Sequence, residues 1–120
     1  MGGEINLTLY ENLEDQYNIG ETVQGYEIKY DAKYEITGNL YIEVSEKTHN
    51  NNEHYIDSGI YRSDNTHTWI IGNYKDVYTF KKNTLIQIHK NNLYFKEVKT
   101  DTSQGMLLDK HLIEKYKLRK

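Results

Sequence analysis

The stretch from Tyr26 to Lys47 constrains the fold more than any other part of this chain. Charged residues alternate with apolar or aromatic ones over 26–31, and apolar residues alternate with polar or aromatic ones over 40–45. A period of two residues is typical of a β-strand with two different faces. The Thr-Gly-Asn segment at 37–39 lies between them, and Gly and Asn adopt a positive φ at low cost. The stretch therefore predicts a β-hairpin.

A three-residue hairpin loop at 36–38 would set the register of these two strands. In that register Asp31 lies directly opposite Glu43. Directly opposed side chains have Cβ atoms about 5 Å apart, and two like charges there destabilise a sheet unless something neutralises them. A divalent cation held by both carboxylates is one solution. The alternative is a loop of another length, which leaves a polar sheet face where the two acids do not meet. The same register pairs Lys29 with Ser45 and Glu27 with Lys47.

The length of 120 residues favours a single domain, 1–120, with one hydrophobic core. The chain has no Cys, which excludes disulfides and thiolate sites. No apolar run approaches the length of a membrane span, and the first residues lead into a polar stretch rather than a signal peptide. We therefore expect a soluble, cytoplasmic protein with no membrane partner.

The net charge of −3 is unlike that of a general nucleic-acid binder, so any contact with DNA needs a local basic patch. One basic cluster is visible near the C-terminus and consists of Lys110, Lys115, Lys117, Arg119 and Lys120. The alternative is a solvated helix end, where cations complement the helix dipole.

Helical and strand patterns alternate along the rest of the chain. A capping box at Thr8 predicts a first helix that ends near Gly20 and carries Glu11 and Glu14. The order of elements predicts a small α/β or α+β fold with helices beside a sheet. After the hairpin we expect a polar loop at 48–54, strands at 67–71 and 77–80, a helix that begins after Asn83 or Thr84, a strand at 93–98, a turn-rich loop at 100–105 and a helix capped by Asp109.

Five short runs follow one another along most of the chain. They are Glu27-Ile-Lys29-Tyr-Asp31, Thr37-Gly38-Asn39-Leu-Tyr-Ile-Glu43, Ser58-Gly59-Ile60, Ser63 to Ile71, and Gly105 to Leu108. In this order they resemble the PD-(D/E)xK nuclease superfamily, and more closely its small phage-type members. The resemblance implies a restriction-endonuclease-like mixed β-sheet core flanked by helices. It also implies Mg²⁺-dependent hydrolysis of phosphodiester bonds.

The resemblance also implies roles for particular residues. Asp31 and Glu43 take the places of the two motif acids, which would hold Mg²⁺ or Mn²⁺ through side-chain oxygens. The Val44 carbonyl would be a further ligand. Glu11 or Glu14 would match the acid that some members carry on the first helix.

The chain departs from the family pattern at one position. The pattern has Lys two residues after the Glu, where it orients water and stabilises developing negative charge, but this chain has Ser45. Lys47 would lie one pleat further on the same face, and Lys29 would lie across from Ser45 in the register above. Either lysine is a candidate replacement, and loss of activity is the other interpretation.

The resemblance thus favours a metal-dependent DNA endonuclease, and a homodimer would suit this activity because one small subunit cuts one strand. The alternative is a catalytically inactive nuclease-fold module that serves a phage or mobile element as a binding or accessory protein. A third interpretation is an interaction domain of unrelated fold whose contact surface is the tyrosine-rich sheet.

Overall fold

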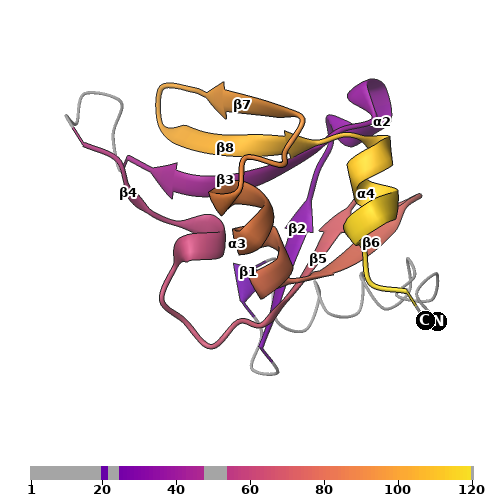
Figure 1. Ribbon diagram of the computed structural model, residues 1–120, viewed down its shortest axis with the longest axis horizontal. Coiled ribbons are helices and arrows are strands. Elements are labelled where there is room, and N and C mark those ends of the chain that lie inside the picture. Colours follow the sequence, from indigo (N-terminus) through magenta and orange to yellow (C-terminus); the bar gives the residue numbers. More distant parts are fainter. Residues whose placement is uncertain (1–19, 22–24, 48–53, 120) are drawn as a thin grey trace.

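Two four-stranded β-sheets and several short helices make up the described part of this α/β protein (Figure 1). The structure is a computed structural model, and it describes residues 20–21, 25–47 and 54–119. The first sheet is mixed, because its two central strands are parallel, and has the order β1 (Gly20–Glu21), β2 (Tyr26–Tyr30), β5 (Thr68–Gly72) and β6 (Val77–Lys81). The second is antiparallel and has the order β4 (Ile56–Asp57), β3 (Leu40–Glu46), β8 (Ser103–Leu108) and β7 (Lys96–Lys99).

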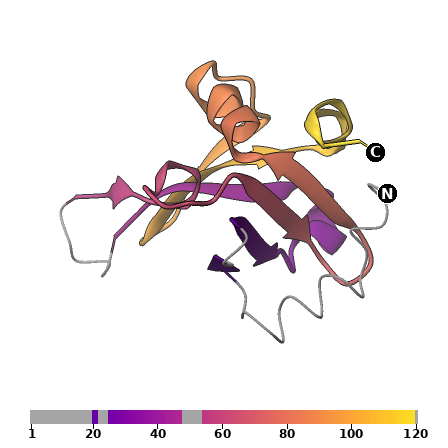
Figure 2. The ribbon, with the colours of Figure 1, turned by 90° about the horizontal axis from the view of Figure 1, so that it is seen from below.

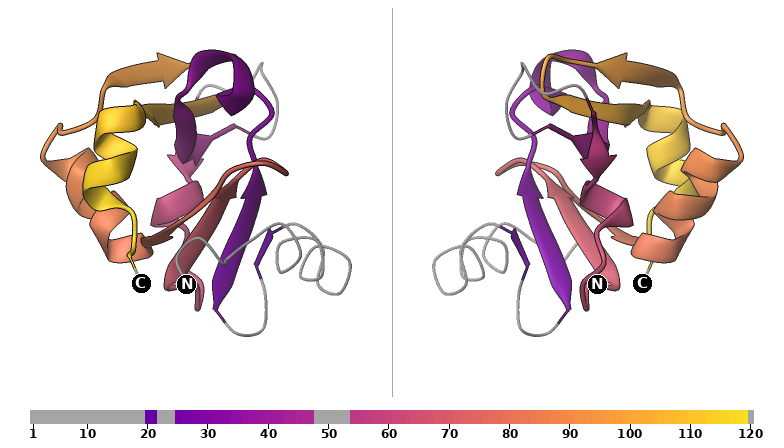
Figure 3. Two further views of the ribbon diagram at one scale, coloured as in Figure 1. Left: turned by 90° about the vertical axis from the view of Figure 1, so that its right-hand side faces the viewer. Right: turned by 90° about the vertical axis from the view of Figure 1, so that its left-hand side faces the viewer.

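The helices connect and cover these sheets. In Figure 2, α3 and α4 lie on one side of β3, whereas β1 and β2 lie on the other side. Both views of Figure 3 show the end of β2 approaching the second sheet before the chain enters α2. The helices are α2 (Tyr34–Thr37), the 3₁₀ helix η2 (Gly59–Tyr61), α3 (Lys82–Lys90) and α4 (Lys110–Tyr116).

The predicted hairpin is wrong, although both of its strands exist. β2 pairs with β1 and β5, and β3 pairs with β4 and β8, so the two strands belong to different sheets. The short helix α2 replaces the hairpin loop, and Gly38 adopts its positive φ of 75° as the C-cap of that helix. The predicted cross-strand pairs therefore do not form. In their place Glu27 lies beside Trp69, and Glu43 lies opposite Gly105.

Most buried apolar side chains form one core. Its side chains come from the faces of β3 and β8 that point toward α3, from α3 itself, and from β5, β6 and α4. Trp69 and Phe80 are its largest fully or nearly fully buried side chains. A smaller cluster contains Ile28 and Ile70, which alternate with Glu27 and Trp69 along their strands and so lie on the other face of the first sheet.

Several predicted elements are confirmed. The strands over 67–71 and 77–80 correspond to β5 and β6, and the helix that carries Leu85 and Ile88 is α3. Asp109 caps α4, since its Oδ1 accepts a hydrogen bond of 2.9 Å from the Leu112 backbone N–H.

Other boundaries differ from the prediction. α3 begins at Lys82 without a side-chain cap, before the predicted caps Asn83 and Thr84. β8 begins at Ser103, inside the predicted loop. The predicted first helix, with Glu11 and Glu14, and most of the polar loop at 48–54 lie outside the described residues. In the described ranges, no helix has the length and apolar character needed to cross a membrane.

Candidate functional site

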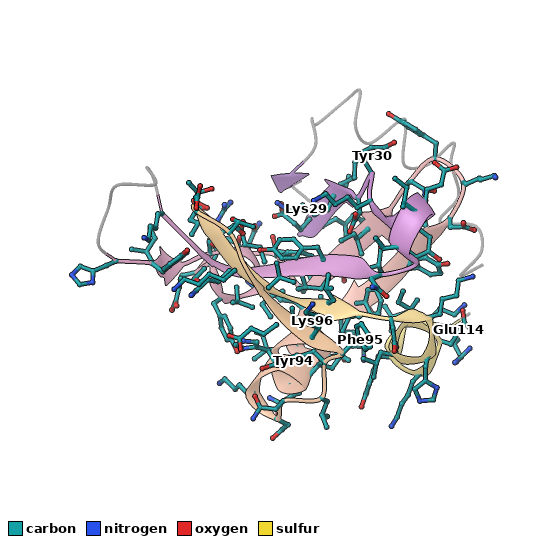
Figure 4. All side chains as sticks on the ribbon, turned by 90° about the horizontal axis from the view of Figure 1, so that it is seen from above. Lys29, Tyr30, Tyr94, Phe95, Lys96 and Glu114 are labelled. Atoms are coloured by element: carbon teal, nitrogen blue, oxygen red, sulfur yellow. The ribbon has the colours of Figure 1, made fainter. Side chains whose placement is uncertain are left out.

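A cavity of about 490 Å³ lies where the end of β2 meets the second sheet. Trp69 and Ile71 of β5 contribute apolar lining, and Tyr41 and Glu43 of β3 line another side. We call this cavity the cleft. In Figure 4 Lys29 and Tyr30, which also line it, lie on the side of β3 away from Tyr94 and Phe95. Its charged lining residues are Lys29, Asp31, Lys33 and Glu43. The cleft thus contains both predicted motif acids and one of the two candidate lysines.

Both carboxylate oxygens of Glu43 accept hydrogen bonds from serine hydroxyls. Ser58 Oγ donates to Oε2 over 2.8 Å, and Ser103 Oγ donates to Oε1 over 2.9 Å. Because the single hydroxyl proton of Ser103 is used for Glu43, the Tyr41 hydroxyl is the donor in its own 2.5 Å contact with Ser103 Oγ. Burial raises the pKa of the Tyr41 phenol above its usual value, and the negative charge of Glu43 raises the pKa further.

Two glycines let other segments approach Glu43 closely. A Cβ atom on Gly105, the partner of Glu43 on β8, would lie 2.6 Å from the Tyr41 ring and 2.5 Å from the Ile42 carbonyl oxygen. A Cβ atom on Gly59 would lie 1.9 Å from the Glu43 carbonyl oxygen. Any larger residue at either position would displace the strand that carries Glu43.

Backbone amides, rather than hydroxyls, surround the Asp31 carboxylate. Its Oδ2 accepts a hydrogen bond of 2.8 Å from the Tyr41 N–H, and its Oδ1 accepts one of 3.2 Å from the Tyr34 N–H. Its own N–H donates to the Gly72 carbonyl over 2.7 Å. Asp31 thereby links β3, α2 and the end of β5. Since residues two apart along a strand are separated by roughly 7 Å, the bond to Tyr41 brings Asp31 near Glu43 without any cross-strand pairing.

Lys29 is held on the cleft side of β2 by two neighbours. Its Nζ lies 3.5 Å from Glu27 Oε2, and 5.8 Å from the centroid of the Trp69 ring. Glu27 is only 5% exposed, so its charge has little access to water and Lys29 is its partner. Pairing with a buried carboxylate restricts the lysine far more than an exposed ion pair does.

A β-bulge removes Ser45 and Lys47 from the cleft. The pairing of β3 with β8 shifts between Glu43 and Ser45, and the extra residue of a bulge resets the alternation of side chains. Ser45 is buried and donates to Gln104 Oε1 over 2.7 Å. The Lys47 ammonium lies 4.8 Å from the centroid of the Tyr55 ring. The expectation that Lys47 lies on the same face as Glu43 is therefore wrong, and neither residue lines the cleft.

The remaining predicted ligands are less available. The Val44 carbonyl already accepts a hydrogen bond of 3.1 Å from the Ser58 N–H. Glu11 and Glu14 fall outside the part of the chain that the structure describes. Among the described residues, no group of three or more His, Asp or Glu side chains is arranged to hold a metal ion. Asp31 and Glu43 are thus the acids available for a cation in the described cleft.

Several residues that shape the cleft were not predicted from the sequence. Ser58 and Gly105 fall in runs that carry the family resemblance, but their contacts with Glu43 were not predicted. Ser103 lies in a segment that is predicted to be a loop, and no pattern in the sequence identifies it as a neighbour of Glu43. Glu27 was expected to pair with Lys47 rather than with Lys29.

Comparisons of this chain with protein-family models, with curated proteins and with solved structures find no match.

Proposed function

We propose that this protein is a metal-dependent DNA endonuclease of the PD-(D/E)xK type, with Asp31 and Glu43 as its metal-binding acids. One observation carries the proposal: Asp31, Glu43 and Lys29 line the same cleft, although Lys29 and Asp31 lie on β2 and directly after it, whereas Glu43 lies on β3 of the other sheet. Two acids and one lysine are the charged groups that this chemistry needs. The volume of about 490 Å³ falls within the usual range of ligand pockets.

The donor set of the cleft fits Mg²⁺ or Mn²⁺. Mg²⁺ keeps several waters and is usually bound by one or two carboxylates together with substrate phosphates, so it does not need a complete protein cage. Asp31 and Glu43 would hold it through their side-chain oxygens. When bound, such an ion supplies charge stabilisation at the phosphate and favours ionisation of a water molecule.

Neighbouring side chains hold Glu43 and Lys29 in place in the cleft. Ser58 and Ser103 hold the Glu43 carboxylate, and both are hydroxyl donors that can rotate toward another acceptor. Lys29 supplies a cation in place of the motif lysine, and its buried partner Glu27 keeps it on the cleft side of β2. A fixed positive charge beside the scissile phosphate would stabilise negative charge that develops during hydrolysis.

A cleavage assay tests the proposal. Wild-type protein is incubated with single-stranded, duplex and branched DNA in Mg²⁺, in Mn²⁺ and in EDTA. We expect cleavage that requires the cation and falls at least about 100-fold in Glu43→Gln, the size of effect seen when a group that stabilises a transition state is removed. Glu46→Gln is the matched control, because Glu46 lies on the same strand but does not line the cleft. Equal activity of both variants would contradict the assignment of Glu43.

Asp31 needs a gentler substitution than alanine. Its carboxylate accepts from two backbone amides, so Asp31→Ala would lower activity through misfolding as well as through loss of a ligand. Asp31→Asn keeps one acceptor oxygen. We expect this variant to lose cation-dependent cleavage while it retains a cooperative unfolding transition. Full activity in Asp31→Asn would count against the metal site.

The second candidate is a nuclease-fold module without catalysis, which binds DNA or a partner protein of a phage or mobile element. One observation favours it: every carboxylate oxygen of Asp31 and Glu43 already has a protein donor, so the cleft is hydrogen-bonded without a cation. This candidate predicts binding that EDTA and Glu43→Gln leave unchanged, with no cleavage of any DNA form.

One cleft cuts one strand at a time, so we also propose that the nuclease works as a homodimer when it cuts both strands of duplex DNA. Sedimentation of the protein with and without duplex DNA tests this point. A monomer that nevertheless makes double-strand breaks at one site in a single encounter would contradict it.

A further inference from the structure

Two lysine ammonium groups lie over one tyrosine ring beside the cleft. Lys47 Nζ is 4.8 Å from the centroid of the Tyr55 ring, and Lys99 Nζ is 5.5 Å from it. Lys47 follows β3, Lys99 ends β7 and Tyr55 precedes β4, so three separate segments build the group. We call it the Lys-Tyr-Lys cluster.

Both ammonium groups lack a carboxylate partner within the described residues. The ion pairs found there join Lys29 to Glu27, Lys82 to Asp64 and Lys117 to Glu114. Glu46 and Asp101, the acids closest in sequence to the cluster, form no such pair with it. The two cations are held by the face of an aromatic ring, which attracts a cation without cancelling its charge. The cluster is therefore a local positive site on a chain whose net charge is −3.

The cluster adjoins the cleft through Thr100. The Tyr55 hydroxyl donates a hydrogen bond of 2.6 Å to the Thr100 carbonyl, and Thr100 is one of the residues that line the cleft. Lys29 and Lys33 line the cleft itself. Asp31 and Glu43 balance these two charges, so the excess positive charge lies at the cluster, which is next to the cleft at Thr100.

The C-terminal basic run is a weaker candidate. Lys117 Nζ lies 3.1 Å from Glu114 Oε2, and the Arg119 guanidinium donates to the Glu114 carbonyl. These cations already have partners within their own helix and its end. The lysines of the cluster have none among the described acids, so they are the better phosphate ligands.

We propose that Lys47, Tyr55 and Lys99 form a phosphate-binding subsite that holds a DNA strand as it leaves the cleft. The proposal rests on the proposed function for the identity of the polyanion. Each lysine neutralises one backbone phosphate, and the ring keeps the two ammonium groups together. Contacts of this kind position a strand and carry no sequence information.

Equilibrium binding in EDTA tests the subsite apart from catalysis. The probe is a fluorescein-labelled single-stranded DNA oligonucleotide, followed by anisotropy over a range of salt concentrations. We expect the Lys47→Gln/Lys99→Gln double variant to bind at least about tenfold more weakly at low salt than the wild type. The plot of log K against log salt concentration should become shallower by about 1.4, because each phosphate that the protein neutralises on a single strand adds about 0.7 to the slope.

Two further double variants test whether any loss of binding is specific to the charges of Lys47 and Lys99. Lys110→Gln/Lys115→Gln removes the same charge from α4 and should leave affinity and slope unchanged. Lys47→Arg/Lys99→Arg keeps the charge and should restore binding, which excludes a folding defect as the cause. Wild-type affinity in Lys47→Gln/Lys99→Gln, an equal loss in the α4 control, or no binding by the wild-type protein would each overturn the subsite.

The cleavage assay separates this proposal from the proposed function. Cation-dependent cleavage by a protein whose DNA affinity is insensitive to Lys47 and Lys99 would overturn the subsite alone. Binding that depends on both lysines, in a protein that cleaves no DNA, would support the subsite and overturn the nuclease.

Discussion

Asp31 and Glu43 line the same cleft, but the protein holds their carboxylates in different ways. Asp31 accepts from the backbone amides of Tyr34 and Tyr41, at the start of α2 and on β3. Glu43 accepts from the hydroxyls of Ser58 and Ser103. Backbone amides are fixed donors, whereas a hydroxyl rotates about its C–O bond and also accepts hydrogen bonds.

The two acids therefore differ in what depends on them: backbone amides depend on Asp31 for an acceptor, whereas Glu43 is bonded to hydroxyls that can change partners. Without the Asp31 carboxylate, the Tyr41 amide at the junction of β2, α2 and β3 loses its acceptor, the Tyr34 amide keeps only the carbonyl oxygen of residue 31, and an unsatisfied donor is costly. Without the Glu43 carboxylate, two hydroxyls turn to other acceptors or to water. We infer that Asp31 maintains the junction in addition to its proposed role as a cation ligand, and that the Glu43 carboxylate is the freer of the two to change its partners.

Asp31→Ala should destabilise the protein most, by about 2 kcal/mol, because it leaves the Tyr41 amide without its acceptor and the Tyr34 amide with only the carbonyl oxygen of residue 31. Urea unfolding measures this change. Asp57→Ala is the control, since Asp57 is exposed and should change stability by less than about 0.5 kcal/mol. If Asp31→Ala is as stable as the control, the structural role of Asp31 is wrong.

Glu43→Gln should cost less stability than Asp31→Ala, about 1 kcal/mol, although it removes cleavage. The amide keeps one acceptor oxygen, and the hydroxyl that loses its acceptor can reorient. Unfolding and cleavage are measured on the same preparations. A loss of stability larger than that of Asp31→Ala would reverse the comparison.

Ser103 and Glu43 should be coupled by about 0.5 kcal/mol. Ser103→Ala removes one donor from Glu43 and also the acceptor of the Tyr41 hydroxyl. A double-mutant cycle with Glu43→Gln isolates the interaction between the two residues. The same cycle between Ser103→Ala and Asp31→Asn should give no coupling, because Asp31 has no hydrogen bond to Ser103.

The Tyr41 phenol should make stability fall at alkaline pH. Burial raises its pKa in the folded protein, so the unfolded chain loses this proton first, near the usual value of about 10. The contribution of Tyr41 is complete below about pH 10 and is lost as the pH rises through the raised pKa of the folded state. Unfolding of wild type and Tyr41→Phe is compared across this range. A wild-type stability that falls no faster than that of Tyr41→Phe would contradict the prediction.

Local structure in the Tyr26–Lys47 stretch follows from sequence, and the partners of its strands do not. Period-two alternation identifies β2 and β3 correctly, because it reports the two faces of each strand. The same pattern suits a hairpin and two strands of separate sheets equally well. What decides between them is α2, a four-residue helix with Tyr34 buried, and so short a helix leaves little periodicity to detect.

The bulge after Glu43 is a second feature that the sequence does not reveal. It places Ser45, which is buried, in a hydrogen bond with Gln104, a residue 59 positions away. Asp31 and Glu43 were expected to share the site through direct cross-strand pairing. They share it through the bond from Tyr41 to Asp31, which is a tertiary contact that no local pattern encodes.

Paramagnetic broadening by Mn²⁺ tests the central claim most directly, because it locates a bound cation without requiring catalysis. Trace Mn²⁺ is added to isotopically labelled wild-type and Glu43→Gln protein, and the amide signals are followed. We predict that the broadening of wild-type signals centres on Asp31, Tyr41 and Glu43, that excess Mg²⁺ reverses it, and that Glu43→Gln abolishes it. Broadening centred on acids outside the cleft, or unchanged in Glu43→Gln, would contradict the account.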